Sequence, residues 1–209
     1  RDADLSDANI EGAVFFFSYL ASANLSDVRA VGTLFHEVFL DSATLDDGNF
    51  EGANFSGAHL HDTSAKDARF VGVNFSGAIL DNADLSEANC EGANFSGASL
   101  NGITLSDARG VGANMSGASL VDAMLNEANF ERANFSGAHL HDANLSEGRF
   151  SRANFSTADL SGAMLNEANL ERAALNHAQL NGAHLAEARG VEAHFHDARL
   201  DDADLNEGN

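Results

Sequence analysis

The sequence predicts an all-β solenoid, a chain that winds into a rod and turns a corner every five residues. Every fifth position from Leu5 to Leu205 keeps one register without an insertion, and 36 of these 41 positions hold Leu, Phe, Ile or Met. The position two residues earlier is Ala in 32 of the 41 repeats. A period of five fits neither the 3.6-residue period of a helix nor the two-residue period of a flat strand, so the chain is one unit repeated.

The repeats share the pattern A-(D/N)-L-x-x, as in residues 3–7, 23–27, 83–87 and 143–147. This pattern resembles the pentapeptide repeat family, and the resemblance extends over essentially all 209 residues. It implies a right-handed quadrilateral β-helix with four pentapeptides per coil, in which the large central residue and the small residue two before it point inward. At a strand spacing of ~4.8 Å the chain would make about ten coils, a rod of roughly 50 Å without large loops.

A longer period of 40 residues supports a coil of 20, because residues 51–90, 91–130 and 131–170 align as units. No composition shift, linker or proline interrupts the repeats, which predicts a single domain over residues 1–209. Residue 1 is not Met and falls inside the repeat pattern, which leaves open that the domain is a fragment of a longer chain.

The composition excludes several classes of function. A formal charge of −21 argues against direct binding of a nucleic-acid backbone or an anionic membrane, both of which need basic surface. No apolar run approaches the ~18 residues of a membrane span. The single cysteine, Cys90, falls at an inward position and is expected to be an inert core residue. The compartment stays unknown, with a soluble, cytoplasmic protein favoured.

When the sequence is written in rows of 20 residues, one row per coil, equivalent positions form columns along the rod. One inward column is mostly Phe, and two others are mostly Leu. The fourth inward column contains small residues at Ala30, Cys90, Gly110 and Gly190. Because Cys90 and Gly110 fall on adjacent coils, we expect a small void beside them, a packing defect rather than a ligand site.

One outward column, the acidic ladder, is negatively charged in every coil. Two residues later, Asn alternates with Arg, and Glu recurs on the coils between the arginines. We expect each Arg to reach a carboxylate of its own coil and a Glu on an adjacent coil. The ladder is then either part of an ion-pair network that fixes the stacking or a recognition edge that presents regular negative charge. The acidic ladder comprises Asp7, Asp27, Asp47, Asp67, Glu87, Asp107, Glu127, Glu147, Glu167, Glu187 and Glu207.

Another face is nearly uncharged and carries a column of asparagines at positions 54, 74, 94, 114, 134 and 154, followed by Ser and Gly columns. Asparagines stacked in this way hydrogen-bond along the stack, which predicts a structural role. The alternative is a flat surface for side-by-side packing.

The same face changes character in the first two coils, where large apolar residues replace Asn, Ser and Gly. Clustered outward apolar residues on an acidic rod are typical of an interface. The alternative is that an N-terminal segment of the same protein covers them. We name this cluster the aromatic patch; its members are Val14, Phe16, Phe17, Tyr19, Leu34 and Phe39.

No residue pattern indicates catalysis or a cofactor. G-x-S-x-G, P-loop, H-E-x-x-H and C-x-x-C motifs are all missing from the sequence, which predicts that the protein is not an enzyme. Pairs of His flank an inward residue at 59 and 61, 139 and 141, and 194 and 196. Two ligands do not make a stable metal site, and adjacent coils add no His in the same columns, so we expect no metal.

The first hypothesis is therefore a non-catalytic structural or protein-interaction scaffold that works through its acidic surface and the aromatic patch. Its partner would be another protein or a second copy, packed side by side or stacked end to end. The resemblance implies an alternative, because some members of the family mimic DNA and bind a type II topoisomerase such as gyrase. The charge fits either hypothesis.

Overall fold

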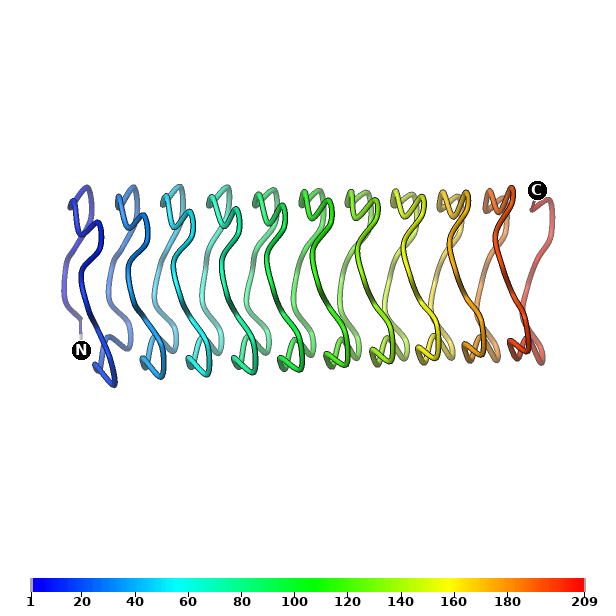
Figure 1. The fold of residues 1–209 in the computed structure, drawn as a ribbon, viewed down its shortest axis with the longest axis horizontal. Coiled ribbons are helices and arrows are strands. Elements are labelled where there is room, and N and C mark those ends of the chain that lie inside the picture. Colours follow the sequence, from blue (N-terminus) through cyan, green and yellow to red (C-terminus); the bar gives the residue numbers. More distant parts are fainter. Residues whose placement is uncertain (1, 209) are drawn as a thin grey trace.

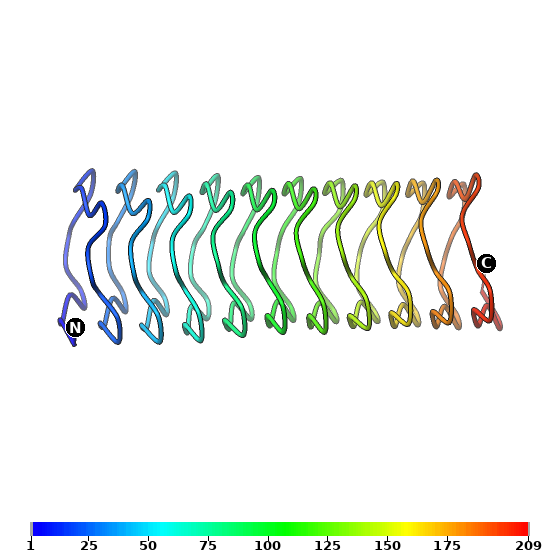
Figure 2. The ribbon, with the colours of Figure 1, turned by 90° about the horizontal axis from the view of Figure 1, so that it is seen from below.

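The computed structural model describes residues 2–208, which wind into one straight rod with the two ends of the chain at opposite ends (Figure 1, Figure 2). Within this range the chain forms no helix and no strand longer than a single bridging residue. Parallel bridges join residues 20 apart, from Asp4–Asn24 at one end to His184–Asp204 at the other. Each coil therefore takes 20 residues and has four bridging residues, one on each of its four sides.

A two-residue turn forms every corner of the coil. The N–H after the turn donates to the C=O before it, as from Ala8 to Leu5 at 3.1 Å. The second turn residue has a φ between 53° and 69°, while the first is not in the left-handed region, which defines a type II turn. Glycine occupies 14 of these positions and other residues 28, so the sequence tolerates a side chain at most corners.

Backbone hydrogen bonds between successive coils fix the spacing of the rod. Leu5 N–H donates to the Asn24 C=O at 2.7 Å, Asp7 N–H to the Ser26 C=O at 3.0 Å, and Asn24 N–H to the Ala3 C=O at 2.9 Å. The same three bonds recur with each repeat, so the buried backbone is paired along most of the rod.

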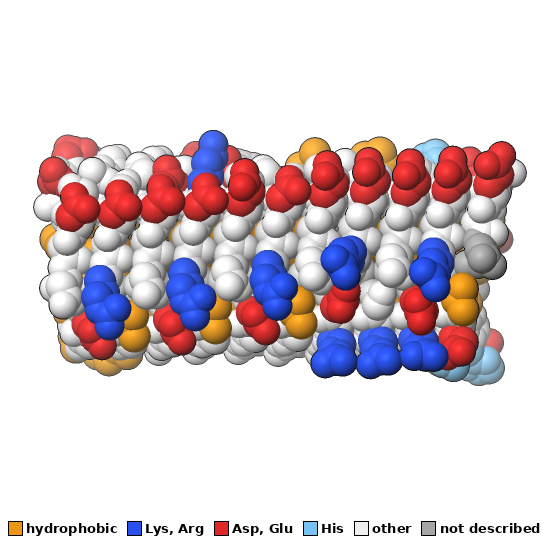
Figure 3. Space-filling view, turned by 90° about the horizontal axis from the view of Figure 1, so that it is seen from above, with side chains coloured by type: hydrophobic (Ala, Val, Ile, Leu, Met, Phe, Trp, Pro, Cys, Tyr) orange, Lys and Arg blue, Asp and Glu red, His pale blue; other side chains and the backbone are white. Residues whose placement is uncertain are grey.

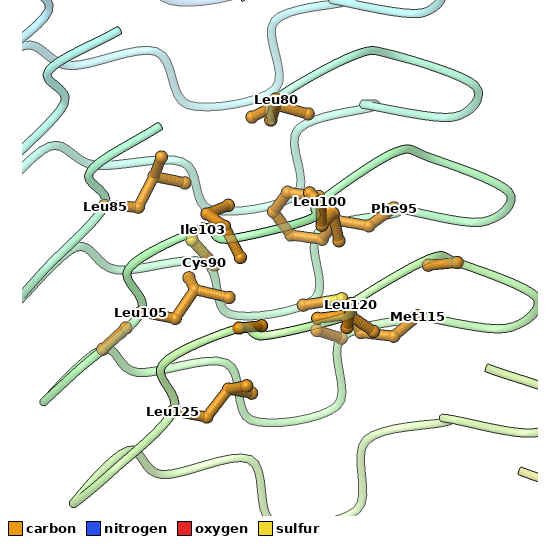
Figure 4. Close-up of a cluster of buried hydrophobic side chains, with 14 of the residues drawn as sticks. Leu80, Leu85, Cys90, Phe95, Leu100, Ile103, Leu105, Met115, Leu120 and Leu125 are labelled. Atoms are coloured by element: carbon orange, nitrogen blue, oxygen red, sulfur yellow. The ribbon is translucent and has the colours of Figure 1, made fainter. Parts of the chain in front are cut away.

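The core is a continuous stack of inward side chains. The predicted Phe column is present, with ring centroids 4.6 Å apart between Phe35 and Phe55 and 4.9 Å apart between Phe75 and Phe95. Stacked rings at this separation match the strand spacing, so each coil with a Phe in this column adds one ring, and Met115 and Leu175 interrupt the stack. Ala and Leu fill most of the rest of the interior, as Figure 4 shows for Leu80, Leu100 and Leu120, and the fourth inward column adds buried rings such as Phe50 and Phe70.

The predicted void beside Cys90 and Gly110 is wrong. The ring of Phe130, one coil further on, lies where a Cβ of Gly110 would stand, so the small residue makes room for a large neighbour. Cys90 is fully buried, among Leu85, Ile103 and Leu105 in Figure 4. Burial raises the pKa of its thiol to about 12, which keeps it protonated and unreactive at neutral pH.

Candidate protein-interaction surfaces

The acidic ladder runs along one corner of the rod, as a row of red side chains in Figure 3. All eleven members are the second residue of a turn, with φ between 56° and 60°, and all are exposed. Within residues 2–208 none of these carboxylates has an ion pair or a side-chain hydrogen bond. The ladder therefore presents uncompensated charge to solvent, at one carboxylate per coil.

The arginines beside the ladder pair with a different set of acids. Each binds the Glu 18 residues earlier, on the preceding coil: Arg29 with Glu11 at 3.0 Å and Arg69 with Glu51 at 3.1 Å. The same pairing recurs for Arg109 with Glu91, Arg149 with Glu131 and Arg189 with Glu171, at 3.0 to 3.2 Å.

The expectation that these arginines also reach a carboxylate of their own coil is wrong. The ladder acids stand at the corner, two residues before the Arg, and their side chains extend from the turn into solvent. The Glu of the preceding coil is the first residue of the next turn, at the other edge of the side that carries the Arg, and its carboxylate is the one that the Arg contacts. About half of each paired side chain is exposed, so a pair contributes less than about 1 kcal/mol.

The asparagine column forms the predicted ladder. The side-chain amide of Asn74 donates to the side-chain oxygen of Asn54 at 3.2 Å, and Asn94, Asn114, Asn134 and Asn154 continue the chain of bonds at 3.0 to 3.2 Å. Each side-chain oxygen also accepts the backbone N–H two residues on, as from Ser56 to Asn54 at 3.0 Å. The asparagine side chains thus make their hydrogen bonds within the rod, which indicates that the column stabilises the fold.

The aromatic patch is exposed at the N-terminal end of the rod. Val14, Phe16, Phe17 and Tyr19 are 59%, 41%, 62% and 71% exposed. Leu34 is half-buried beneath them. Four large apolar side chains therefore lie exposed on one part of the surface, an arrangement that is typical of an interface.

Ring stacking holds the patch in a fixed shape. Tyr19 stacks on Phe39 with centroids 4.7 Å apart, and Phe39, which is half-buried, stacks on His59 at 4.6 Å. The ring of Phe16 lies 3.6 Å from that of His36. These contacts join neighbouring coils, so the aromatic rings are positioned before any partner arrives.

The sequence analysis missed a second departure from the columns, a row of three basic side chains that we name the arginine stripe. It consists of Arg132, Arg152 and Arg172, and in Figure 3 it runs along the lower edge of the C-terminal half. The same column is Gly at 12, 32, 52, 72, 92 and 112. The change from Gly to Arg is visible when the sequence is written in rows of 20 residues, so the sequence alone could have revealed the arginine stripe.

The members of the stripe differ in their pairing. Arg172 binds Glu192, a contact that raises the pKa of the guanidinium and lowers the pKa of the carboxyl through their hydrogen bond. Arg132 and Arg152 have no ion pair or side-chain hydrogen bond in the described chain. They line a groove of about 280 Å³ together with Glu131, Ser151 and Glu171.

The histidine pairs contact neighbouring carboxylates. His61 contacts Asp62 at 3.1 Å and His141 contacts Asp142 at 3.0 Å, each with the residue that follows it. Across residues 2–208 no cluster of three or more His, Cys, Asp or Glu could hold a metal ion. The same range contains no helix long and apolar enough to cross a bilayer.

Comparison with known proteins identifies the class of protein. The family model of pentapeptide repeats matches in eight copies, over residues 1–36, 23–62, 68–107, 88–123, 113–152, 133–172 and 168–206. The chain therefore belongs to the pentapeptide repeat family. No curated protein sequence matches it.

Two solved structures show the same fold. HetL, a pentapeptide repeat protein involved in heterocyst differentiation regulation from the cyanobacterium Nostoc sp. strain PCC 7120, is 27% identical; the match covers 99% of this chain and 89% of HetL, with a TM-score of 0.52. Full-length QnrB1, a plasmid-mediated fluoroquinolone resistance protein, is 24% identical over 95% of this chain and 92% of its own, with a TM-score of 0.52. At 24% identity, the likeness to QnrB1 is evidence of a shared fold and carries no conclusion about function.

These matches confirm the right-handed quadrilateral β-helix. Members of the family are generally non-enzymatic scaffolds. The geometry of this chain agrees with that class, because its irregular features are surface patches on a continuous repeat.

Proposed function

We propose that this protein is a non-catalytic interaction scaffold that binds a protein partner through the aromatic patch. The observation that carries the proposal is the exposure of Val14, Phe16, Phe17 and Tyr19 at positions where, from the third coil on, every residue except Ile79 is small or polar. Fully burying a large apolar side chain contributes about 1.5–3 kcal/mol, so two or three of them would anchor an interface. The regulatory role attributed to HetL is consistent with a protein of this kind.

The acidic ladder gives the proposed surface its electrostatic character. Its carboxylates have no basic partner within residues 2–208 and repeat once per coil, so they would attract a partner with basic surface and accelerate its approach. The patch then supplies the apolar contact, and the ladder the long-range attraction.

The repeat itself supplies a matched variant for the test. Phe16→Ser with Phe17→Gly converts the patch to the residues that stand at positions 56 and 57, and Gly suits the φ of 55° at Phe17. A control variant, Met124→Thr, removes a side chain that is 40% exposed on another side and restores the residue found at 104. Both variants keep the net charge of −21.

The experiment captures proteins from the source cell on immobilised wild type, patch variant and control variant, and quantifies them by mass spectrometry. We expect a protein retained by wild type and control and lost from the patch variant, followed by direct titration of that protein against all three. Equal retention on all three, with no protein dependent on the patch, would overturn the proposal.

The uncompensated acidic ladder favours a second candidate, a DNA mimic that binds a type II topoisomerase. Twenty-one negative charges over roughly 50 Å give about 0.4 charge per Å, against about 0.6 for duplex DNA at one per ~1.7 Å. A gyrase supercoiling assay tests this candidate. Inhibition or protection that is lost when ladder acids become Gln or Asn supports it, and no effect at micromolar protein rejects it.

A further inference from the structure

We propose that two copies of this chain associate side by side and in parallel, with the arginine stripe of each against the acidic ladder of the other. The proposal does not depend on the aromatic patch, which lies in the first two coils, whereas the stripe lies at residues 132–172. Loss of one contact would leave the other intact, so the two proposals fail separately.

The first argument is that both rows have charge without a partner. Within residues 2–208, no carboxylate pairs with Arg132 or Arg152. In the same range, no cation pairs with the ladder acids Glu127, Glu147 and Glu167. All of these side chains are exposed. Nearby Glu131 and Glu171 do not neutralise the stripe, because each already binds its own arginine, Arg149 or Arg189, at 3.0 and 3.2 Å.

The second argument is the departure from the repeat. At the stripe's column, six consecutive coils carry Gly with φ between 64° and 69°, and the next three carry Arg with φ between 59° and 62°. An L-residue at this φ is less favourable than Gly, yet three long cations replace it in succession. The neighbouring column holds Val at 31, 71, 111 and 191, but Ser at 151, between two arginines of the stripe. The site is therefore polar and basic on a strongly acidic rod.

The third argument is that the spacings agree. Stripe and ladder each repeat every 20 residues, so in two parallel rods both rows have the coil spacing of ~4.8 Å. Arg132 and Glu127 follow each other along one side of the same coil and differ in height by about a quarter of that spacing. A second copy thus places a ladder acid beside each arginine of the stripe, of which Arg132 and Arg152 have no acid within residues 2–208 and Arg172 already binds Glu192.

The fourth argument fixes the orientation. The stripe and the ladder border the same side of the rod, one along each edge, as Figure 3 shows. When two copies face each other with this side in parallel, a twofold axis along the rods places each stripe opposite the partner's ladder. An antiparallel pair would place ladder against ladder. Between the edges lie Arg–Glu pairs such as Arg149 with Glu131, which are neutral as pairs.

Long-range repulsion between two chains of charge −21 does not prevent this contact at physiological ionic strength. The Debye length is then about 8 Å, so charges further apart than this are screened, while opposite charges in contact still attract. The eight ladder acids of each copy that meet no stripe arginine border the same side, and their repulsion weakens the contact. Individual exposed ion pairs are weak, which predicts a reversible dimer rather than a permanent one.

The test compares wild type with a triple variant, Arg132→Gly, Arg152→Gly and Arg172→Gly, by sedimentation velocity over a concentration series at physiological salt. These substitutions restore the glycine that the column uses elsewhere, so the fold is retained. The control, Gly77→Asp, Gly97→Asp and Gly117→Asp, gives the same net charge at a different corner, where an added Cβ meets no atom within 4 Å. We expect wild type and control to dimerise and the stripe variant to have a dissociation constant at least about tenfold higher.

Cross-linking tests the orientation. The chain has one lysine, Lys66, so Arg152→Lys introduces a unique amine into the stripe for a zero-length carbodiimide. In the dimer band we expect a peptide that joins position 152 to Glu147 or Glu167. A monomer at all concentrations, equal dimerisation of the stripe variant, or dimer cross-links that avoid the ladder would each overturn the proposal.

Discussion

Replacing Asn114 with Ala removes three hydrogen bonds from the middle of the asparagine ladder. The amide of Asn114 donates to Asn94 at 3.0 Å, its oxygen accepts from the amide of Asn134 at 3.2 Å, and the same oxygen accepts the Ser116 N–H at 3.2 Å. The column already contains Ala174, so the smaller side chain is compatible with the coil.

The expected loss of stability follows from the number of bonds. Each intramolecular hydrogen bond contributes about 0.5–1.5 kcal/mol net, so the three bonds predict a loss of about 1.5–4.5 kcal/mol for Asn114→Ala. Asn154→Ala is the matched comparison, because Asn154 makes two such bonds, with Asn134 and the Ser156 N–H, and the next coil has Ala174 in place of an asparagine that would donate to Asn154. We expect a loss of about 1–3 kcal/mol there, two thirds of the loss at Asn114.

Denaturant unfolding measures both variants against wild type, with an unchanged m-value as the sign that the folded and unfolded states are comparable. If the asparagine ladder stabilises the fold, Asn114→Ala in its middle lowers the free energy of unfolding more than Asn154→Ala at its end. A loss below about 0.5 kcal/mol for Asn114→Ala, or a larger loss for Asn154→Ala, would refute it.

Three further predictions concern the core and the ion pairs. Gly110→Ala should destabilise the fold by about 1–3 kcal/mol in denaturant unfolding, because the new methyl group overlaps the ring of Phe130; an unchanged midpoint would contradict that packing. Burial raises the pKa of Cys90 from 9.0 to about 12, so above pH 9 the unfolded chain loses a proton that the folded chain keeps, and stability should fall by up to ~1.4 kcal/mol per pH unit toward pH 12. Cys90→Ala should remove that part of the pH dependence, and an identical slope in both proteins would disprove the assignment. Arg69→Gln should cost less than about 1 kcal/mol, since its pair with Glu51 is about half exposed; a larger loss would mean that the pair stabilises the stacking.

The fold could be predicted from the sequence because the chain repeats one local rule. A large inward residue every five, with a small residue two before it, leaves only a narrow tube in which both fit. The same repetition predicts the Phe stack and the asparagine ladder, since residues 20 apart must be neighbours. These features depend only on the period, so no knowledge of side-chain conformations is needed.

The errors and the omission have a different origin. The void beside Cys90 was predicted from the small size of Gly110, but Phe130 on the next coil extends its ring along the rod into that space. The pairing of Arg29 with its own coil failed for a similar reason, because the direction of the side chain decides which coil it reaches, and it reaches Glu11. Column position alone does not contain that direction.

The arginine stripe could have been predicted but was not. Its signal is a change of residue type within one column, the same kind of signal that identified the aromatic patch. What the sequence could not give is the pairing state, because Arg172 binds Glu192 whereas Arg132 and Arg152 bind no acid of the described chain. That difference decides whether the stripe is structural or free to bind.

The central claim is that the inward columns and the asparagine ladder serve folding, whereas the aromatic patch and the unpaired charges at the surface serve binding. The free energy of unfolding of the Phe16→Ser, Phe17→Gly variant tests it most directly. If the aromatic patch serves contact with a partner, the free energy of unfolding of the variant is no more than about 1 kcal/mol below that of the wild type, because the variant adopts the residues of later coils. A loss of more than about 2 kcal/mol would show that the exposed rings hold the first coils together, and would contradict the account.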